Sequence, residues 1–268
     1  MQGYIFRVFG EDFDRLKLFD KGGYSLIYLC GMTKPDFTFT SKKPSSIIKI
    51  LNPSSSKKQI SKDRSKLEAR ILEEIKGSGI DIFEKSTNFF NFNDSSKGTN
   101  FAIKMPYLGQ NLEQVHQSYQ SIRKNIPLID QLLCFSSISN ALSTIHQLGI
   151  IHRDVKQSNI VCLNNSYRLI DYGVSKADLS KSPSDEIKYL SGQIDHYESE
   201  GGIITGTPSY MPIEQINLDK RGIESDIYSY CVMMYEIITN RNYFEQVKLA
   251  TNNKSNNPIC QFHFTTIT

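Results

Sequence analysis

The segment from Ile150 to Ile160, IIHRDVKQSNI, constrains this chain more than any other. An apolar pair leads into a histidine, an arginine, an aspartate, a lysine and an asparagine within eight residues. A solvated loop needs no such order, and a buried loop tolerates ionisable groups only where each has a partner or a task. The order suits phosphoryl transfer, in which Asp154 accepts the proton of an attacking hydroxyl, Lys156 neutralises the moving phosphoryl group and Asn159 gives an oxygen to Mg²⁺.

The other groups that such a reaction requires occur elsewhere along the chain. Asp171 ends a short apolar run in RLIDYGVSK, where a second carboxylate can bridge a metal ion to phosphates. Upstream, Lys49 lies within the β-branched run SSIIKIL, and Glu68 in the following helical segment can orient it as an ion pair. The stretch FDKGGYSLIY can fold over the phosphates from above.

Composition excludes several classes of protein. With 39% hydrophobic and 22% charged residues in 268, the chain is typical of a globular protein, and no apolar run approaches the roughly 20 residues of a membrane span. A net charge of +3 is too small to indicate nucleic-acid binding. Five cysteines without a CxxC pair indicate free thiols in a reducing compartment, which favours the cytoplasm or the nucleus.

Hydrophobic periodicity predicts strands and one helix in the first half. Strands are expected over 25–32, 45–51 and 100–108, and a helix over 65–79, where apolar residues recur at helical spacing. The segment NFFNFNDSSKGTN is rich in Asn and Ser and is expected to form a surface loop around short ordered pieces.

The second half is expected to be mainly helical. One helix is predicted between Pro127 and Gly149, and the segment 225–240 is predicted to be a helix that is buried on all sides. The first of these helices carries a predicted core stripe of Leu128, Leu132, Phe135, Ile138, Leu142 and Ile145.

Taken together, the motifs resemble those of eukaryotic-type protein kinases. HRDVKQSN resembles the HRDxKxxN catalytic loop, DYG the DFG metal motif, SIIKI the VAIK strand, GTPSYMPIEQ the GTPxYMAPEQ segment, and SDIYSYCVMMYEIITNR the long central helix. The resemblance implies an α+β, two-lobed kinase-like fold. Residues 1–108 would form a small β-rich N-lobe with one helix and the hinge, 109–250 a mainly helical, incomplete C-lobe, and 251–268 an Asn/Ser-rich tail.

The resemblance also implies a serine/threonine protein kinase that transfers the γ-phosphoryl group of ATP to a protein substrate. Asp154 takes the role of catalytic base, Lys156 matches the lysine typical of serine/threonine specificity, and Thr207 matches the threonine that holds both. His152 and Asp226 match partners that tie the catalytic loop to the central helix. Magnesium is expected on Asn159 and Asp171. Nucleotide contacts are expected from Gly22, Ile27, Lys49, Met105, Leu108, Asn159, Val161 and Asp171.

The chain departs from the family pattern in its phosphate loop and at its C-terminal end. Asp20 and Ser25 stand at glycine positions of the family's GxGxxG loop, which predicts weaker nucleotide binding, and Ile47 replaces a smaller residue above the adenine. The helices that follow the central helix in the family have no counterpart, so we expect a truncated kinase domain in which that helix loses burial at Ile227, Cys231, Met234 and Ile238. The alternative function is a pseudokinase or inactive fragment that serves as a binding scaffold.

Three finer questions stay open at the level of sequence. YLGQNLEQV is similar to a segment of the casein kinase I group, although PIEQ does not fit that group. The activation segment, residues 171–214, is rich in Ser and is either a solvated insertion or a phosphorylation switch read by Arg153 and Lys176. The oligomeric state is not given by the sequence.

Overall fold

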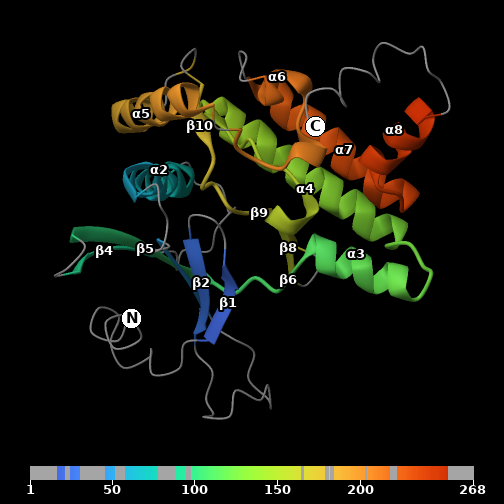
Figure 1. Cartoon of the computed structure of the whole chain (residues 1–268). Helices are drawn as coiled ribbons and strands as arrows, with labels where there is room; N and C mark the ends of the chain where they lie inside the picture. Colours follow the sequence, from blue (N-terminus) through green and yellow to red (C-terminus); the bar gives the residue numbers. More distant parts are fainter. Residues whose placement is uncertain are drawn as a thin grey trace. The chain divides into compact units, whose positions relative to one another are not determined.

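The computed structural model describes residues 17–21, 25–30, 46–51, 58–77, 88–94, 98–163, 166–178, 181, 184–202, 204–217 and 222–252. The chain divides into two compact units, Met1–Leu108 and Gly109–Thr268. Figure 1 shows the helices and strands of each unit, which are described separately below.

The first unit contains an antiparallel sheet with the strand order β1-β2-β3-β5-β4, accompanied by the helix α2. In β3, Ser46, Ile48 and Ile50 are buried while the residues between them are half-buried, as the alternation of side chains along a strand requires. Lys49 lies opposite Ile27 of β2 and Ile103 of β5. The elements are β1 (Lys17–Lys21), β2 (Ser25–Cys30), β3 (Ser46–Leu51), α2 (Lys58–Gly77), β4 (Asn88–Asp94) and β5 (Gly98–Pro106).

Two predictions for this unit differ from the structure. Helix α2 begins at Lys58, seven residues before the predicted start, because Ile60, Ser61 and Arg64 continue its buried face toward the N-terminus. The segment predicted as a surface loop contains β4, which pairs with β5 from Asn88 to Asp94. Asparagine suggested a turn there, but the phenylalanines of NFFNFND favour a strand and the backbone pairing with β5 stabilises it.

The second unit is mainly helical and carries short strands around the catalytic loop. Two small sheets, β6-β8-β9 and β10-β7, flank the loop, which begins after β7 and ends before β8. The helices are α3 (Leu112–Ser121), α4 (Leu128–Gln147), α5 (Asp185–Gly201), α6 (Ile213–Ile216), α7 (Ile223–Thr239) and α8 (Tyr243–Asn252), with the 3₁₀ turns η2 (Gln157–Asn159) and η3 (Pro208–Tyr210). The strands are β6 (Gln110–Asn111), β7 (Ile150–Ile151), β8 (Ile160–Leu163), β9 (Ser166–Leu169) and β10 (Lys176–Ala177).

The predicted core stripe of α4 is correct only toward its C-terminal end. Phe135, Ile138, Leu142 and Ile145 are buried, whereas the first two members of the stripe, Leu128 and Leu132, are 69% and 54% exposed. In the first turns of α4, the buried positions are instead taken by Gln131 and Cys134.

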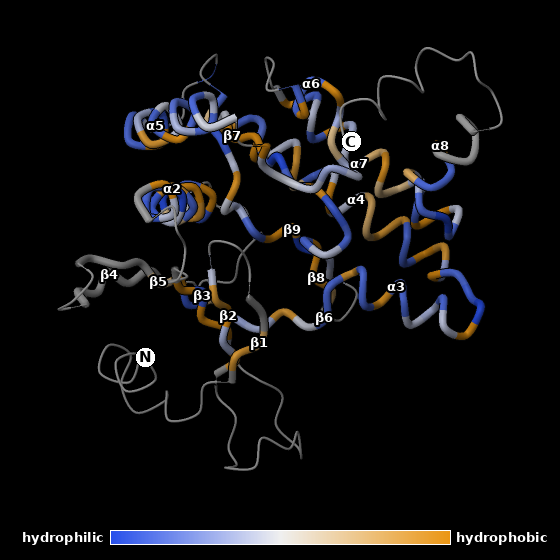
Figure 2. The backbone as a smooth tube through the Cα atoms, viewed as in Figure 1, coloured by the Kyte–Doolittle hydropathy of each residue, from blue (hydrophilic) through white to orange (hydrophobic). Residues whose placement is uncertain are grey.

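Helix α7 has one buried face and one accessible face, contrary to the prediction of burial on all sides. Its buried face includes Asp226, Ser229, Val232, Met233 and Glu236, so polar side chains share it with apolar ones. Figure 2 shows apolar residues along α7 as well. The accessible residues follow helical spacing in the part of the chain that the structure describes: Ile227 (47% exposed), Cys231 (exposed), Met234 (half-buried) and Ile238 (52% exposed).

The length and hydropathy of the helices also bear on membrane insertion. Among the residues that the structure describes, none of the helices combines the length and the apolar character needed to span a bilayer.

Candidate active site

The catalytic loop is anchored to α7 through Asp226, whose carboxylate is completely buried. One carboxylate oxygen accepts the backbone N–H of Arg153 at 2.7 Å. The other accepts the backbone N–H of His152 at 2.8 Å and lies 2.8 Å from Nε2 of His146. His152 Nε2 in turn contacts the carbonyl of Ile170 at 3.1 Å. The expected ties of His152 and Asp226 between loop and helix are therefore present.

The loop turns at Arg153, which adopts a left-handed backbone conformation with φ 69°. Few non-glycine residues occupy this region, because the Cβ atom crowds the backbone there. The buried hydrogen bond from the Arg153 N–H to Asp226 stabilises the turn. The loop conformation is thus set by a carboxylate more than seventy residues away in the sequence.

Beyond the turn, Asp154, Lys156 and Thr207 form a closed polar triangle. The hydroxyl of Thr207 donates to Oδ1 of Asp154 at 2.7 Å, Nζ of Lys156 lies 2.8 Å from Oδ2 of Asp154, and the same Nζ donates to Oγ1 of Thr207 at 2.7 Å. The Asp154 side chain is 11% exposed, so it remains in contact with solvent. Charge-assisted bonds of this kind fix the orientation of the carboxylate.

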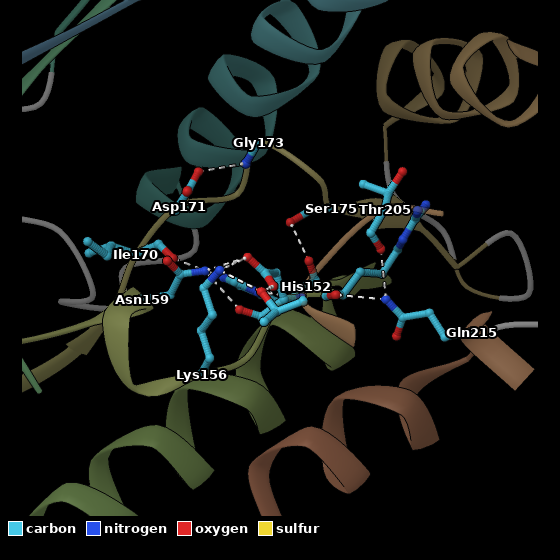
Figure 3. Close-up of polar contacts among 12 residues, drawn as sticks. His152, Lys156, Asn159, Ile170, Asp171, Gly173, Ser175, Thr205 and Gln215 are labelled. Atoms are coloured by element: carbon cyan, nitrogen blue, oxygen red, sulfur yellow. Dashed lines mark hydrogen bonds and ion pairs between the residues drawn. The ribbon is translucent and has the colours of Figure 1, made fainter. Parts of the chain in front are cut away.

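Asn159 joins the triangle to the segment around Asp171. Its amide nitrogen donates to the backbone carbonyl of Asp154 at 2.8 Å and to Oδ2 of Asp154 at 2.9 Å. The backbone carbonyl of Asn159 accepts a hydrogen bond from the backbone N–H of Ile170 at 2.9 Å. This bond places the start of the DYG motif beside the catalytic loop. Figure 3 shows Lys156, Asn159, Ile170 and Asp171 in this arrangement.

The residues expected to bind metal suit Mg²⁺ in their chemistry. Asp171 is exposed, has φ 67°, and its Oδ1 accepts the backbone N–H of Gly173 at 3.3 Å. Asn159 uses its amide nitrogen toward Asp154, which leaves the amide oxygen as its ligand atom. Magnesium commonly takes one or two oxygens from the protein and the rest from water and phosphates. Among the described residues no group of three or more His, Cys, Asp or Glu could hold a metal ion, so a cage made only of protein ligands is absent there.

In the first unit, Lys49 of β3 and Glu68 of α2 form the predicted ion pair. Nζ of Lys49 lies 2.7 Å from Oε1 of Glu68, and the side chains are 11% and 5% exposed. Low exposure strengthens the attraction, because little water screens the two charges. The pair fixes the lysine at a defined position on the sheet.

The other predicted nucleotide contacts are divided between the two units. Met105 and Leu108 are buried and Ile27 is half-buried in the first unit, while Val161 is buried in the second. Gly22 lies outside the described residues.

Sequence reasoning missed a buried carboxylate, Glu236 of α7. It accepts hydrogen bonds from the hydroxyl of Tyr210 and from Nε2 of Gln157 at 3.1 Å, and the backbone N–H of Tyr243 donates to its other oxygen at 3.2 Å. Burial and the bond to Glu236 raise the pKa of Tyr210, so this phenol stays protonated. Glu236 also lines a polar cavity of about 220 Å³ beside the catalytic loop, together with Glu113, His116, Gln117, Gln120, Gln157, Tyr210, Arg241 and Asn242. Its position in the segment MMYEIIT was a visible signal, because a charged residue stands there within an apolar run.

A second missed residue is Gln215 of α6. Its amide nitrogen donates to the carbonyl of Arg153 at 2.9 Å and to the carbonyl of Thr205 at 3.0 Å, and the residue is 1% exposed. It therefore links the catalytic loop directly to the end of the activation segment.

Comparison with known proteins agrees with this geometry. The family model of the protein kinase domain matches residues 21–267. A probable serine/threonine-protein kinase of Dictyostelium discoideum is 28% identical over 247 residues, which cover 88% of this chain and 49% of that protein. Serine/threonine-protein kinase pkn3 of Myxococcus xanthus is 26% identical over 201 residues, or 71% of this chain and 34% of that protein.

The match to the family model extends over most of the chain, and the chain belongs to the protein kinase domain family. It spans about half the length of the Dictyostelium protein and about a third of the Myxococcus one.

Proposed function

We propose that this chain is the catalytic domain of a serine/threonine protein kinase, which transfers the γ-phosphoryl group of ATP to serine or threonine hydroxyls of a protein substrate. The observation that carries the proposal is the closed triangle of Asp154, Lys156 and Thr207. A chain that served only as a scaffold would have no need of a carboxylate held by three side chains and still open to solvent. The relatives described above are named as serine/threonine kinases, which supports the same assignment.

Each member of the second unit's network has a role in this reaction. Asp154 accepts the proton of the attacking hydroxyl, for which its partly exposed carboxylate is accessible. Lys156 bridges Asp154 and Thr207 and offers positive charge to the phosphoryl group in transfer. Asn159 and Asp171 hold Mg²⁺, which when bound neutralises charge on the phosphates. Thr207 orients the base and the lysine together.

The first unit contributes the Lys49–Glu68 pair and an apolar set of residues. We assign the α- and β-phosphates to Lys49, whose ammonium group Glu68 holds in place. We assign contacts with the adenine ring to Ile27, Met105 and Leu108 of this unit. In this scheme Met1–Leu108 is the N-lobe and Gly109–Thr268 contains the C-lobe.

The proposed location is a reducing compartment, the cytoplasm or the nucleus. The described cysteines Cys134, Cys162 and Cys231 are free thiols, which agrees with such a compartment. Burial raises the pKa of Cys134 to about 12, so this thiol stays protonated and unreactive.

The test is phosphoryl transfer by the purified full chain. The chain is incubated with radiolabelled ATP, Mg²⁺ and a generic protein substrate, and the product is hydrolysed to identify the labelled amino acid. Phosphoserine or phosphothreonine is the expected product, and its formation should stop when Mg²⁺ is chelated. Phosphotyrosine as the main product, or no transfer by a chain that is folded and binds Mg-ATP, would contradict the proposal.

A further inference from the structure

A carboxylate of the activation segment, Glu198, pairs with Arg153 of the catalytic loop. Arg153 is 2% exposed, and its Nη2 donates to Oε2 of Glu198 at 2.8 Å, with both side chains at most 3% exposed. The other oxygen of Glu198 accepts the hydroxyl of Thr205 at 3.1 Å. An arginine that reads a phosphorylated segment would need an acceptor of this kind, and here a carboxylate provides it.

The carboxylate is held in place by a whole helix. Glu198 belongs to α5, whose buried residues Ile187, Leu190, Ser191, Ile194 and Glu198 recur at intervals of three and four positions and form one face. The hydroxyl of Ser191 accepts the backbone N–H of Ala177 in β10 at 2.9 Å. Glu198 is therefore the last member of a packed stripe.

The second cation predicted to read a phosphate, Lys176, is also paired with a carboxylate of α5. Nζ of Lys176 lies 2.6 Å from Oδ2 of Asp195, and these side chains are 21% and 30% exposed. The Arg153 guanidinium and the Lys176 ammonium group are therefore each paired with a carboxylate of α5. A phosphate of charge about −2 placed beside Arg153 would meet the buried charge of Glu198 and be repelled by it.

The Arg153–Glu198 ion pair is connected to the segment that orients the catalytic base Asp154. The carbonyl of Arg153 accepts a hydrogen bond from Nε2 of Gln215, and the same nitrogen donates to the carbonyl of Thr205, two residues before Thr207. Between them, Gly206 has φ 116°, and a Cβ atom there would lie 2.7 Å from the carbonyl oxygen of Arg153. The segment that carries Thr207 consequently runs in close contact with the loop that carries Asp154.

We propose that Glu198 is the permanent counter-ion of Arg153 and a positioning residue for the catalytic loop, so that the enzyme acts without phosphorylation of its activation segment. This inference rests on the proposed kinase function. The Glu198 carboxylate is buried and accepts hydrogen bonds from Arg153 and Thr205, so its effect on the reaction passes through the loop that Arg153 belongs to. Among the described residues, Glu198 is the one acceptor of the Arg153 guanidinium, and the buried Nε of that group has no hydrogen-bond partner there.

The first experiment measures the need for phosphate. The full chain is treated with a broad-specificity protein phosphatase, the phosphatase is removed, and the absence of phosphate is checked by mass spectrometry. Transfer to substrate is then followed from the moment of mixing with Mg-ATP. The treated chain should keep its rate within roughly twofold and show no lag. A lag, or a large loss of rate after treatment, would overturn the inference while leaving the kinase function intact.

The second experiment tests the ion pair by substitution. Glu198→Leu leaves the buried arginine without its carboxylate, and we expect kcat to fall roughly tenfold or more with little change in KM for ATP. The double variant Arg153→Met/Glu198→Leu removes both charges and should recover most of the loss, because an apolar pair can replace a buried ion pair. Asp195→Asn is the matched control, since it removes a half-exposed pair of the same helix and should change little.

The same variants are compared by thermal unfolding. Glu198→Leu should lower the unfolding midpoint and the double variant should restore it, whether or not the chain proves active. If the wild type transfers no phosphate at all, the proposed function fails. The comparison of unfolding midpoints between the single and double variants still decides whether Glu198 is the counter-ion of Arg153. A midpoint and a kcat for Glu198→Leu that equal those of Asp195→Asn would overturn the inference.

Discussion

Removal of the Asp226 carboxylate is the sharpest test of how the catalytic loop is held. In Asp226→Ala the backbone N–H groups of His152 and Arg153 lose acceptors at 2.8 and 2.7 Å, in a site with no exposure to solvent. An unsatisfied buried donor costs about 1–3 kcal/mol, so the two together should cost about 2–6 kcal/mol. Net stabilities of domains are about 5–15 kcal/mol, and the loss is therefore large enough to unfold part of the population.

The assay combines urea unfolding of the full chain with hydrogen exchange of the peptide that covers residues 150–160. Glu224→Ala is the control, because Glu224 is exposed in the first turn of the same helix and should change stability by about 0.5 kcal/mol or less. Asp226→Asn keeps the shape and one acceptor oxygen, so it should fall between the two. If the free energy of unfolding of Asp226→Ala lies within about 1 kcal/mol of the wild-type value and its loop amides stay protected from exchange, the reasoning is refuted.

Two further predictions concern other buried polar groups. Glu68→Ala breaks the low-exposure pair with Lys49 and should lower the free energy of unfolding by about 3–5 kcal/mol, measured by thermal unfolding. The control Glu73→Ala removes a side chain that is 42% exposed and should lower it by about 0.5 kcal/mol or less. Equal effects of the two variants would contradict the argument. Burial raises the pKa of Tyr172 above its ordinary value of 10, so the unfolded chain releases this proton first and stability should fall as pH rises above about 10. Tyr172→Phe should make unfolding less sensitive to pH in that range, and an unchanged slope would count against this.

The sequence was most informative where the chemistry lies in short segments. Asp154, Lys156 and Asn159 stand within six residues, and Glu68 lies in the helical segment that follows Lys49, where its pairing with Lys49 was predicted. Thr207 was found through a family motif rather than from spacing alone, because it reaches Asp154 across more than fifty residues.

What the sequence did not reveal depends on contacts between distant segments. Glu198 meets Arg153 across 45 residues, and a Ser-rich composition hid the apolar spacing of Ile187, Leu190 and Ile194 that builds α5. For α7, the many apolar residues suggested burial on all sides, and this was wrong. The four positions at which a loss of burial was expected, Ile227, Cys231, Met234 and Ile238, do lie on its accessible side, because packing decides which side of a helix is covered. The strand β4 was hidden by asparagine, whose turn preference is weaker than pairing along a neighbouring strand.

The most direct test of the phosphotransfer account is the rate of γ-phosphoryl transfer by Asp154→Asn beside the wild type, at saturating Mg-ATP. The variant keeps the size of the side chain and one acceptor for Thr207 but cannot take up the substrate proton. The account predicts a fall in kcat of about 100-fold or more, with nearly unchanged binding of Mg-ATP. A variant that transfers phosphate at close to the wild-type rate would contradict it.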